Sequence, residues 1–213
     1  KFVNTRSEYE RTLKQRNTLL KSLGRRSPST QARATLDAWD EQLIQTGTEL
    51  IATRIENIKR IEPHLTEFGT AISGDTEPLF LSYSNSWLPI EVSDKTEIAK
   101  LFKTELENRS KDEVDRGVTL VGPHRDDINI QLSNMPAKGY ASHGQSWSIA
   151  IALRLAAFKI LREQDDDPIL ILDDVFAELD EKRRNRLVAI IADVEQTLIT
   201  AAVIADIPKG LPS

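Results

Sequence analysis

The sequence predicts an α/β protein, and two observations carry this prediction. Residues 139–213 alternate continuous apolar runs with a helical pattern, and the first 70 residues place apolar side chains at the three-to-four spacing of amphipathic helices. The 213 residues include no Cys, and no stretch approaches 18 consecutive apolar residues. We therefore expect a cytoplasmic protein without disulfides, thiolate metal sites or a membrane partner.

Two long helices are expected at the front of the chain. Apolar residues recur at helical spacing over 9–23 and again over 36–61. Residues 24–30 contain a Gly, a Pro and Ser or Thr, which stop and cap helices, so the two helices should fold back as a hairpin. Pro63 is expected to end or bend the second helix.

The middle of the chain mixes strand and helix patterns. The polar residues 122–127 contain Gly-Pro and suit a hairpin turn or a short connection. The expected elements are a strand at 79–83, a turn at 84–89, a helix at 95–109, and strands at 119–121 and 128–132 on either side of residues 122–127.

Residues 139–213 predict a parallel strand-helix-strand unit. The continuous apolar run at 169–172 is typical of a strand buried on both faces. The expected order is a polar loop at 139–145, a helix at 147–161 that begins near Ser146, the strand at 169–172, a helix at 181–194 and a second strand at 197–204.

Two acids follow the first of these strands, where open parallel sheets bind their ligands. A carboxylate at that edge can hold hydrated Mg²⁺, and a neighbouring acid can orient a water that attacks a phosphate. Asp173 and Asp174 are the candidates, although capping of the next helix or contact with solvent would also explain them.

A second candidate site lies directly before the apolar helix. Backbone amides, a hydroxyl and the positive end of the helix dipole meet there, and Gly allows a close approach of phosphate. The residues concerned are Ser142, Gly144 and Gln145.

Charge is distributed unevenly along the chain. Residues 1–35 carry nine Lys and Arg against two acidic residues, whereas the whole chain has a net charge of -5. Such a basic segment can bind a polyanion, or it can be the solvated face of a helix. Arg25, Arg26 and Arg33 are the candidates for contacts with a polyanion.

Three ordered segments resemble the ATP-binding cassette superfamily: a signature loop that opens a helix (142–145), a Walker B strand that ends in acids, and a D-loop (177–180). Within that superfamily, residues 122–127, 142–145 and 172–180 and the helix at 9–21 are similar to the RecF family, and the resemblance covers nearly the whole chain. It implies part of an ABC-type (P-loop) ATPase head with a helical arm subdomain. The implied domains are a helical arm at 1–78, a connecting strand and helix region at 79–116, and the C-terminal half of the ATPase lobe at 117–213.

The resemblance also assigns roles to the candidate residues. In the ATP-dependent homodimer that it implies, the signature residues contact the γ-phosphate held by the opposite subunit. The shorter side chain of Asp174, where most cassette ATPases have Glu, fits slow turnover. The implied roles are Mg²⁺ coordination through water for Asp173, hydrolysis for Asp173 and Asp174, ATP binding in trans for Ser142, Gly144 and Gln145, and the D-loop aspartate for Asp180.

A Walker A loop is missing from the sequence. Such a loop needs Gly, four residues, Gly, Lys and Ser or Thr, and the glycine pairs 69/74 and 139/144 both lack the Lys. The resemblance places Walker A ahead of the helical arm. We therefore expect this chain to be the C-terminal part of such a protein, without ATPase activity of its own.

The function that the resemblance implies is DNA replication and repair. It includes ATP-dependent binding to single-stranded or gapped DNA, weak DNA-stimulated ATP hydrolysis, and help to RecO and RecR in loading recombinase at single-strand gaps, with a role in the SOS response. A non-catalytic helical interaction module, supported by a degenerate ATPase sheet, is the main alternative. A transporter-coupled ATPase would leave the basic helical hairpin unexplained.

Overall fold

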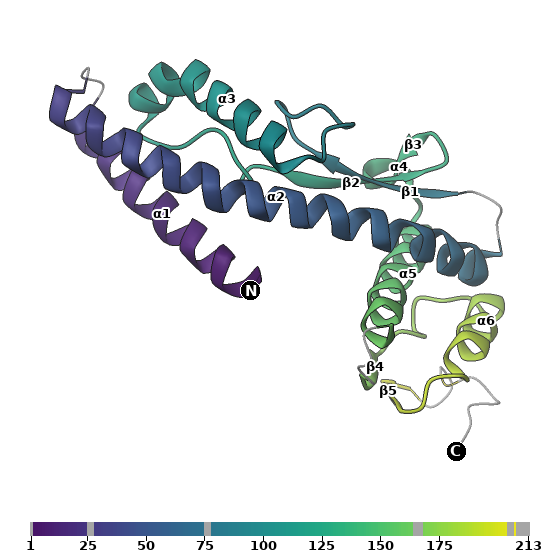
Figure 1. Ribbon diagram of the computed structural model, residues 1–213. Helices are drawn as coiled ribbons and strands as arrows, with labels where there is room; N and C mark the ends of the chain where they lie inside the picture. The colour runs from purple at the N-terminus through teal and green to yellow at the C-terminus, as the bar shows by residue number, and fades with distance from the viewer. Residues whose placement is uncertain (1, 25–27, 75–77, 164–167, 204–206, 208–213) are drawn as a thin grey trace. The chain divides into compact units, whose positions relative to one another are not determined.

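The computed structural model describes residues 2–24, 28–74, 78–163, 168–203 and 207. The chain contains both helices and strands, with a parallel strand-helix-strand unit near its end, which confirms the predicted α/β class (Figure 1). None of the helices in these described ranges is long and apolar enough to cross a membrane. The elements are α1 (Phe2–Leu23), α2 (Thr30–Ser73), β1 (Leu79–Ser84), α3 (Lys95–Arg116), β2 (Asp127–Leu132), β3 (Met135–Pro136), α4 (Ala137–Tyr140), α5 (His143–Arg162), β4 (Leu170–Asp173), α6 (Glu181–Ile191) and β5 (Thr197–Thr200).

The chain divides into two compact units, each made of two separate stretches. The first unit comprises Lys1–Asn57 and Ser82–Ile128, and the second comprises Ile58–Leu81 and Asn129–Ser213. The three contiguous domains expected from the sequence stay a prediction. We describe each unit by itself.

The first unit is built on the predicted helical hairpin. α1 lies beside the first part of α2, and α3 packs against both (Figure 1). Each helix contributes one buried apolar residue to a shared cluster, namely Leu20, Leu36 and Val114. The hairpin prediction is therefore confirmed, although residues 25–27 of its turn lie outside the described part of the chain.

A larger apolar core fills the rest of the first unit. Tyr9 of α1, Leu43 of α2 and Phe102 of α3 are at most 2% exposed, and the Trp87 ring stacks on Phe102 with 5.1 Å between ring centroids. Gly122 lies against Tyr9 and Phe102 of this core and has a φ of 124°. A Cβ atom there would lie 2.6 Å from the Tyr9 hydroxyl oxygen, so only glycine fits both the backbone and the space.

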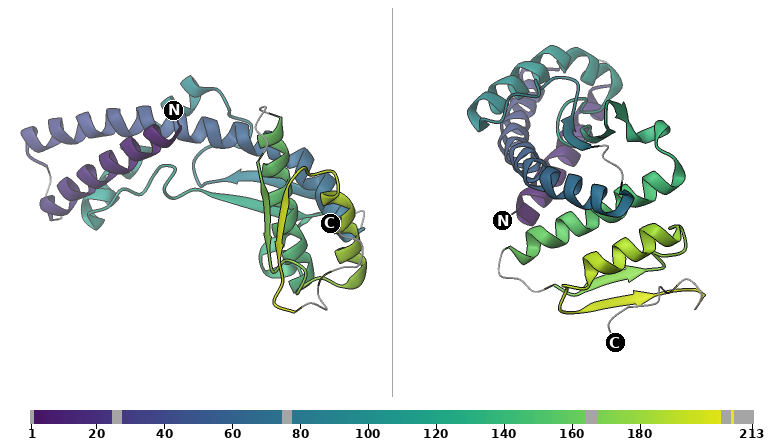
Figure 2. Two further views of the ribbon diagram at one scale, coloured as in Figure 1. Left: turned by 90° about the horizontal axis from the view of Figure 1, so that it is seen from below. Right: turned by 90° about the vertical axis from the view of Figure 1, so that its right-hand side faces the viewer.

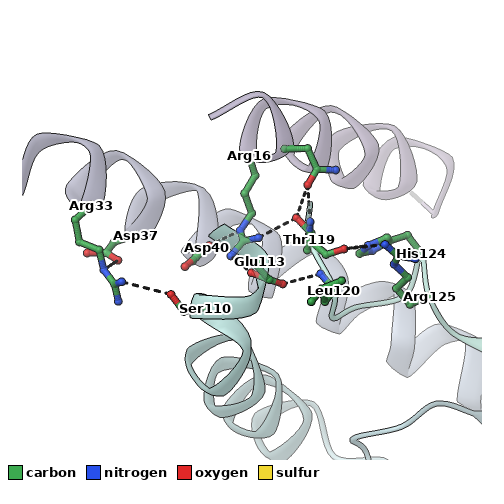
Figure 3. Close-up of polar contacts among 11 residues, drawn as sticks. Arg16, Arg33, Asp37, Asp40, Ser110, Glu113, Thr119, Leu120, His124 and Arg125 are labelled. Atoms are coloured by element: carbon green, nitrogen blue, oxygen red, sulfur yellow. Dashed lines mark hydrogen bonds and ion pairs between the residues drawn. The ribbon is translucent and has the colours of Figure 1, made fainter. Parts of the chain in front are cut away.

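One buried arginine joins three segments of the first unit (Figure 3). The Arg16 side chain is 1% exposed, and its Nε lies 2.5 Å from Asp40 Oδ1 of α2. Its Nη2 lies 2.7 Å from Glu113 Oε2 of α3, and Glu113 is fully buried. Nη1 donates to Thr119 Oγ1 at 2.8 Å. Burial raises the pKa of Glu113, and the adjacent guanidinium opposes that effect.

The Glu113 contact explains why α3 is longer than predicted. α3 continues past Arg109 to Arg116, and Gly117 ends it with a φ of 65°. The last turns of α3 are rich in charged residues, so hydrophobic periodicity misses them. Polar contacts attach these turns to the rest of the first unit. Glu113 pairs with Arg16 and accepts a hydrogen bond from the Leu120 amide at 2.7 Å.

The predicted strand at 119–121 is wrong, and so is the hairpin that it would form with 128–132. Residues 119 and 120 are irregular because side chains take up their backbone hydrogen bonds. The Thr119 amide donates to Asn17 Oδ1 at 2.7 Å, and the Thr119 carbonyl accepts from His124 Nε2 at 3.2 Å and Arg125 Nη2 at 3.3 Å. No group of Thr119 is left for a sheet ladder.

The second unit contains the predicted parallel crossover. β4 and β5 pair in parallel, with Leu170 opposite Thr197 and Asp173 opposite Thr200, and α6 connects them. Figure 2 shows α5 and α6 on one side of this strand pair. β5 ends at Thr200, earlier than the predicted strand end at 204, a residue outside the described ranges.

The prediction that the strand at 169–172 is buried on both faces is wrong. Leu170 and Leu172 of β4 are buried, but Ile171 is 62% exposed and Ile169, just before the strand, is 51% exposed. The helices of the second unit cover one face of the pair, so side chains alternate between buried and exposed (Figure 2).

The sequence predicts that Pro63 ends or bends the second helix, and the first of these two outcomes is wrong. α2 continues through Pro63 to Ser73. Proline removes one backbone hydrogen bond from a helix, which costs about 3 kcal/mol. The helix beyond it is held by tertiary packing, since Leu65 and Ile72 are fully buried.

We predict that Arg16→Met lowers the free energy of unfolding by about 3–5 kcal/mol, because the substitution leaves Glu113 as a buried charge without its partner. Urea unfolding of the chain, followed by circular dichroism, measures this. The control is Arg6→Met, which breaks an exposed pair with Glu10 on the same helix and should cost less than about 0.5 kcal/mol. Equal losses in the two variants would contradict a central role for Arg16.

A pH-dependent prediction concerns Asp126, which follows the loop at 119–125. Burial raises its pKa to about 6, although Tyr83 Oη donates to Asp126 Oδ2 at 2.5 Å and opposes the shift. Since the folded state binds this proton more tightly than the unfolded state, the stability that Asp126 contributes falls as the pH rises from about 4 through about 6.

Tyr83→Phe should raise the pKa of Asp126 further, as measured by NMR titration of the carboxyl carbon, because it removes the donor to the carboxylate. Asp126→Asn should remove the stability change over this pH range. The exposed neighbour Asp127 offers the control Asp127→Asn, which should keep the wild-type pH profile. A normal carboxyl pKa for Asp126 would refute the prediction.

Candidate functional site

The two candidate acids lie at the carboxyl end of the parallel strand pair in the second unit. Asp173 is the last residue of β4, and Thr200, its partner in register, is the last residue of β5. The Thr200 hydroxyl donates to Asp173 Oδ1 and accepts from the Asp174 amide at 3.1 Å. One hydroxyl therefore fixes the Asp173 carboxylate and the start of the next loop. Sequence reasoning missed Thr200, because the register of two strands leaves no pattern in the sequence.

Asp174 has a left-handed backbone with φ at 49°, which is uncommon for a residue other than glycine. Its amide also donates to the Thr200 carbonyl at 3.2 Å, and its Oδ1 accepts from the Ala202 amide at 3.4 Å. These bonds hold the turn in place. Asp173 and Asp174 are both exposed, so their remaining carboxylate oxygens face solvent.

Two exposed carboxylates at one strand end fit Mg²⁺, which usually takes one or two carboxylates together with waters and substrate phosphates. Among the described residues, no group of three or more His, Cys, Asp or Glu could hold a metal ion by itself. These two acids would therefore need oxygens from a bound phosphate to complete the coordination of Mg²⁺.

The candidate phosphate site is the first turn of α5 rather than a loop. The helix begins at His143, earlier than the predicted start near Ser146, and Ser142 is its N-cap. Ser142 Oγ accepts from the Gln145 amide at 3.2 Å, and Gln145 Oε1 accepts from the Ser142 amide at 2.8 Å. This reciprocal capping box has a sequence signal, Ser-x-x-Gln, which hydrophobic periodicity overlooks.

Capping leaves part of this turn available to a ligand. The Ser142 hydroxyl uses a lone pair as the cap and keeps its proton to donate. The first amides of a helix have no acceptor within the helix, and the helix dipole favours an anion there. Ser142 is exposed, while Gly144 and Gln145 are half-buried. The turn can therefore bind an anion without losing its cap.

Residues 177–180, the expected D-loop, lie beside this turn. His143 Nε2 is 3.0 Å from Glu178 Oε2, and Trp147 Nε1 of α5 donates to the Val175 carbonyl at 3.1 Å. Asp180 is the N-cap of α6 and accepts from the Arg183 amide at 2.9 Å, a bond that lowers the pKa of Asp180. The structure thus brings the expected signature segment and the expected D-loop together, although the contacting residues His143 and Glu178 are 35 positions apart in sequence.

The basic candidates belong to the first unit. Arg25 and Arg26 lie outside the described residues. Arg33 is half-exposed on α2, where its Nε lies 3.3 Å from Asp37 Oδ1 and its Nη1 donates to Ser110 Oγ at 3.4 Å (Figure 3). Asp37 therefore offsets part of its charge. Counting basic residues overstates the basic surface, because Arg16 is buried.

No protein-family model matches the sequence. The chain is 44% identical over 225 residues to the DNA replication and repair protein RecF of Cutibacterium acnes, covering 99% of this chain and 57% of that protein. It is 44% identical over 214 residues to RecF of Streptomyces avermitilis, with the same coverage. The chain thus spans 57% of the length of these two curated relatives.

The backbone is similar to solved structures of RecF. The recombination mediator protein RecF, solved as RecF-ATP in the RecFOR pathway, superposes with a TM-score of 0.82 and 27% identity over 95% of this chain and 53% of that chain. The RecF-ATPrS structure matches with the same TM-score and identity over 97% of this chain and 54% of that chain. The expected fold, part of an ABC-type ATPase head, is confirmed.

Sequence identity of 44% over 99% of the chain, together with a similar backbone, shows that this chain belongs to the RecF family.

Proposed function

We propose that this chain supplies part of an ATP-dependent DNA replication and repair protein, in which ATP joins two copies into a clamp on DNA. Its main support is the capped first turn of α5, which lies against the D-loop within the second unit. Relatives named for DNA replication and repair, and a RecF relative solved with ATP, support the same function.

In this proposal, the signature residues act in trans. Ser142 donates its hydroxyl proton to a phosphate held by the opposite copy, while the first amides of α5 face the same oxygens. Gln145 keeps the cap in place, since its Oε1 accepts from the Ser142 amide. ATP would then stabilise the dimer by the free energy of these charge-assisted bonds.

Asp173 is proposed to hold Mg²⁺ through water, in the orientation that the Thr200 hydroxyl sets. Asp174 is proposed to orient the attacking water. Its Oδ1 accepts a weak, 3.4 Å bond from the Ala202 amide, and its side chain is a methylene shorter than Glu. Both features suit slow hydrolysis, which would release the dimer after a delay.

DNA is the proposed macromolecular ligand, with RecO and RecR as partners in loading recombinase at single-strand gaps. The basic segment at 1–35 would attract the phosphate backbone without reading bases. A non-catalytic helical interaction module is the second candidate, since the first unit, which contains the helical hairpin, has its own packed core. ATP-dependent dimerisation of the full-length protein separates the two, because the second candidate requires none.

We predict that Ser142→Asp in the full-length protein abolishes ATP-driven dimerisation but keeps the stability of α5. Asp is as good an N-cap as Ser, yet its charge repels phosphate. Ser142→Ala should weaken dimerisation by about 10-fold or more, because it removes a charge-assisted hydrogen bond. Light scattering against ATP concentration measures both effects.

Ser146→Ala is the matched control, since Ser146 is exposed one turn further along α5. It should dimerise like the wild type. If Ser142→Asp formed dimers at the wild-type ATP concentration, the phosphate of ATP would not lie at this turn, and the proposed function of the signature segment would be wrong.

For DNA, we predict that replacing Arg25, Arg26 and Arg33 with Ala in the full-length protein flattens the slope of log affinity against log salt by about two to three units. Each phosphate contact contributes roughly 0.9 to that slope for duplex DNA. The control removes the same charge from exposed lysines of α3, namely Lys100, Lys103 and Lys111, and should leave the slope unchanged. A slope that responds to the control instead would place the DNA site on α3.

A further inference from the structure

The loop that joins β4 to α6 begins with a residue in an unfavourable conformation. Asp174 lies in the left-handed region with φ at 49°. The Cβ atom makes this region less favourable than the right-handed one, although Asp tolerates it better than most residues do. Contacts with neighbouring elements therefore have to hold this turn.

On the amide side of Asp174, the contacts come from β5. The Asp174 amide donates to the hydroxyl of Thr200 at 3.1 Å and to its carbonyl at 3.2 Å. Both distances exceed the usual value of about 2.9–3.0 Å, and the two bonds share one proton. β5 thus fixes the start of the turn with a single N–H group.

On the carbonyl side, the contact comes from α5. Val175 follows Asp174 directly and is buried, and its carbonyl accepts a hydrogen bond from Trp147 Nε1 at 3.1 Å. Trp147 is half-buried on α5, two residues beyond Gln145 of the capping box. An indole has only this one donor, so the ring position on α5 sets where the Val175 carbonyl lies.

α5 also contacts this loop through a weaker pair. The side chains of His143 and Glu178 are 78% and 50% exposed, and an exposed pair contributes little. The Trp147 bond instead lies next to Val175 and Phe176, which are 5% and 0% exposed. A hydrogen bond in such surroundings contributes about 1 kcal/mol. Of the two contacts, the Trp147 bond is therefore the one that can hold the turn.

We propose that Trp147 is a positioning residue for Asp174. Its indole N–H fixes the backbone directly after Asp174 and so keeps the carboxylate in the orientation that hydrolysis needs. The inference rests on the proposed role of Asp174 in orienting the attacking water. It assigns to α5 a second task besides phosphate binding, which is to set the turn that carries this acid.

The test replaces Trp147 in the full-length protein with Phe and, separately, with 3-benzothienylalanine, which keeps the shape of the indole but has sulfur in place of N–H. In both variants kcat for ATP hydrolysis should fall about 10-fold, since small displacements of a catalytic group lower the rate strongly. The ATP concentration at half-maximal dimerisation should stay within about 2-fold of the wild type, because Ser142 and its capping box are unchanged.

The control is Trp39→Phe, the same chemical change on α2. Within the described residues the Trp39 indole donates no hydrogen bond, so kcat should stay within about 2-fold of the wild type. Wild-type kcat in the benzothienylalanine variant would overturn the proposal, because the N–H would then have no part in hydrolysis. An equal loss of dimerisation and of kcat would also overturn it, since the defect would lie in α5 as a whole.

NMR tests the contact without ATP. The ¹³Cα chemical shift of Asp174 should have the value typical of a left-handed backbone in the wild type and should change when the Trp147 N–H is lost. An unchanged shift would overturn the inference, because Trp147 would not hold the turn. If the wild-type protein neither dimerised with ATP nor hydrolysed it, the proposed function would fail, and the Asp174 shift would still decide whether Trp147 holds the turn.

Discussion

The first unit depends on one buried guanidinium. Arg16 satisfies Asp40, Glu113 and Thr119 at once, and these three residues belong to α2, α3 and the segment that follows α3. Burying such charges costs several kcal/mol per ion, so the network adds little to stability compared with an apolar core of equal volume. We infer that its effect is on specificity, because an arrangement of the helices that separated Arg16 from Glu113 would leave a buried charge without a partner.

The same network marks the limit of sequence prediction for the fold. Hydrophobic periodicity located α1, α2, β1, α6 and the parallel β4–β5 pair, since each depends on apolar spacing. It failed at residues 119–121, where an apolar Thr-Leu-Val run suggests a strand. The Asn17 side chain, 102 residues away, and the nearby His124 and Arg125 side chains bond the Thr119 backbone instead. Hydrophobic periodicity registers none of these polar contacts.

For the candidate site, the types of residue were predictable and their arrangement was not. Acids after an apolar strand and Ser-x-x-Gln before an apolar helix can be recognised from the sequence. The Thr200 hydroxyl that orients Asp173 and the contact of His143 with Glu178 depend on how separate elements pack. Such supporting residues hold a site in its geometry, and only the folded chain brings them into contact.

The polar groups of the second unit divide into donors and acceptors at different places. The first turn of α5, with Arg183 above Gly144, offers hydrogen-bond donors and positive charge, while Asp173 and Asp174 offer carboxylates at the end of β4. Within the described residues, no hydrogen bond or ion pair joins these two groups. A nucleotide with Mg²⁺ needs both kinds of group: donors for its phosphate oxygens and carboxylates for its cation. In a pair of copies, each chain could offer its donors to the nucleotide whose Mg²⁺ the other chain holds. Under the proposed function, this separation within one chain would tie ATP binding to dimerisation, since the two kinds of group would meet around one triphosphate only in a pair of copies.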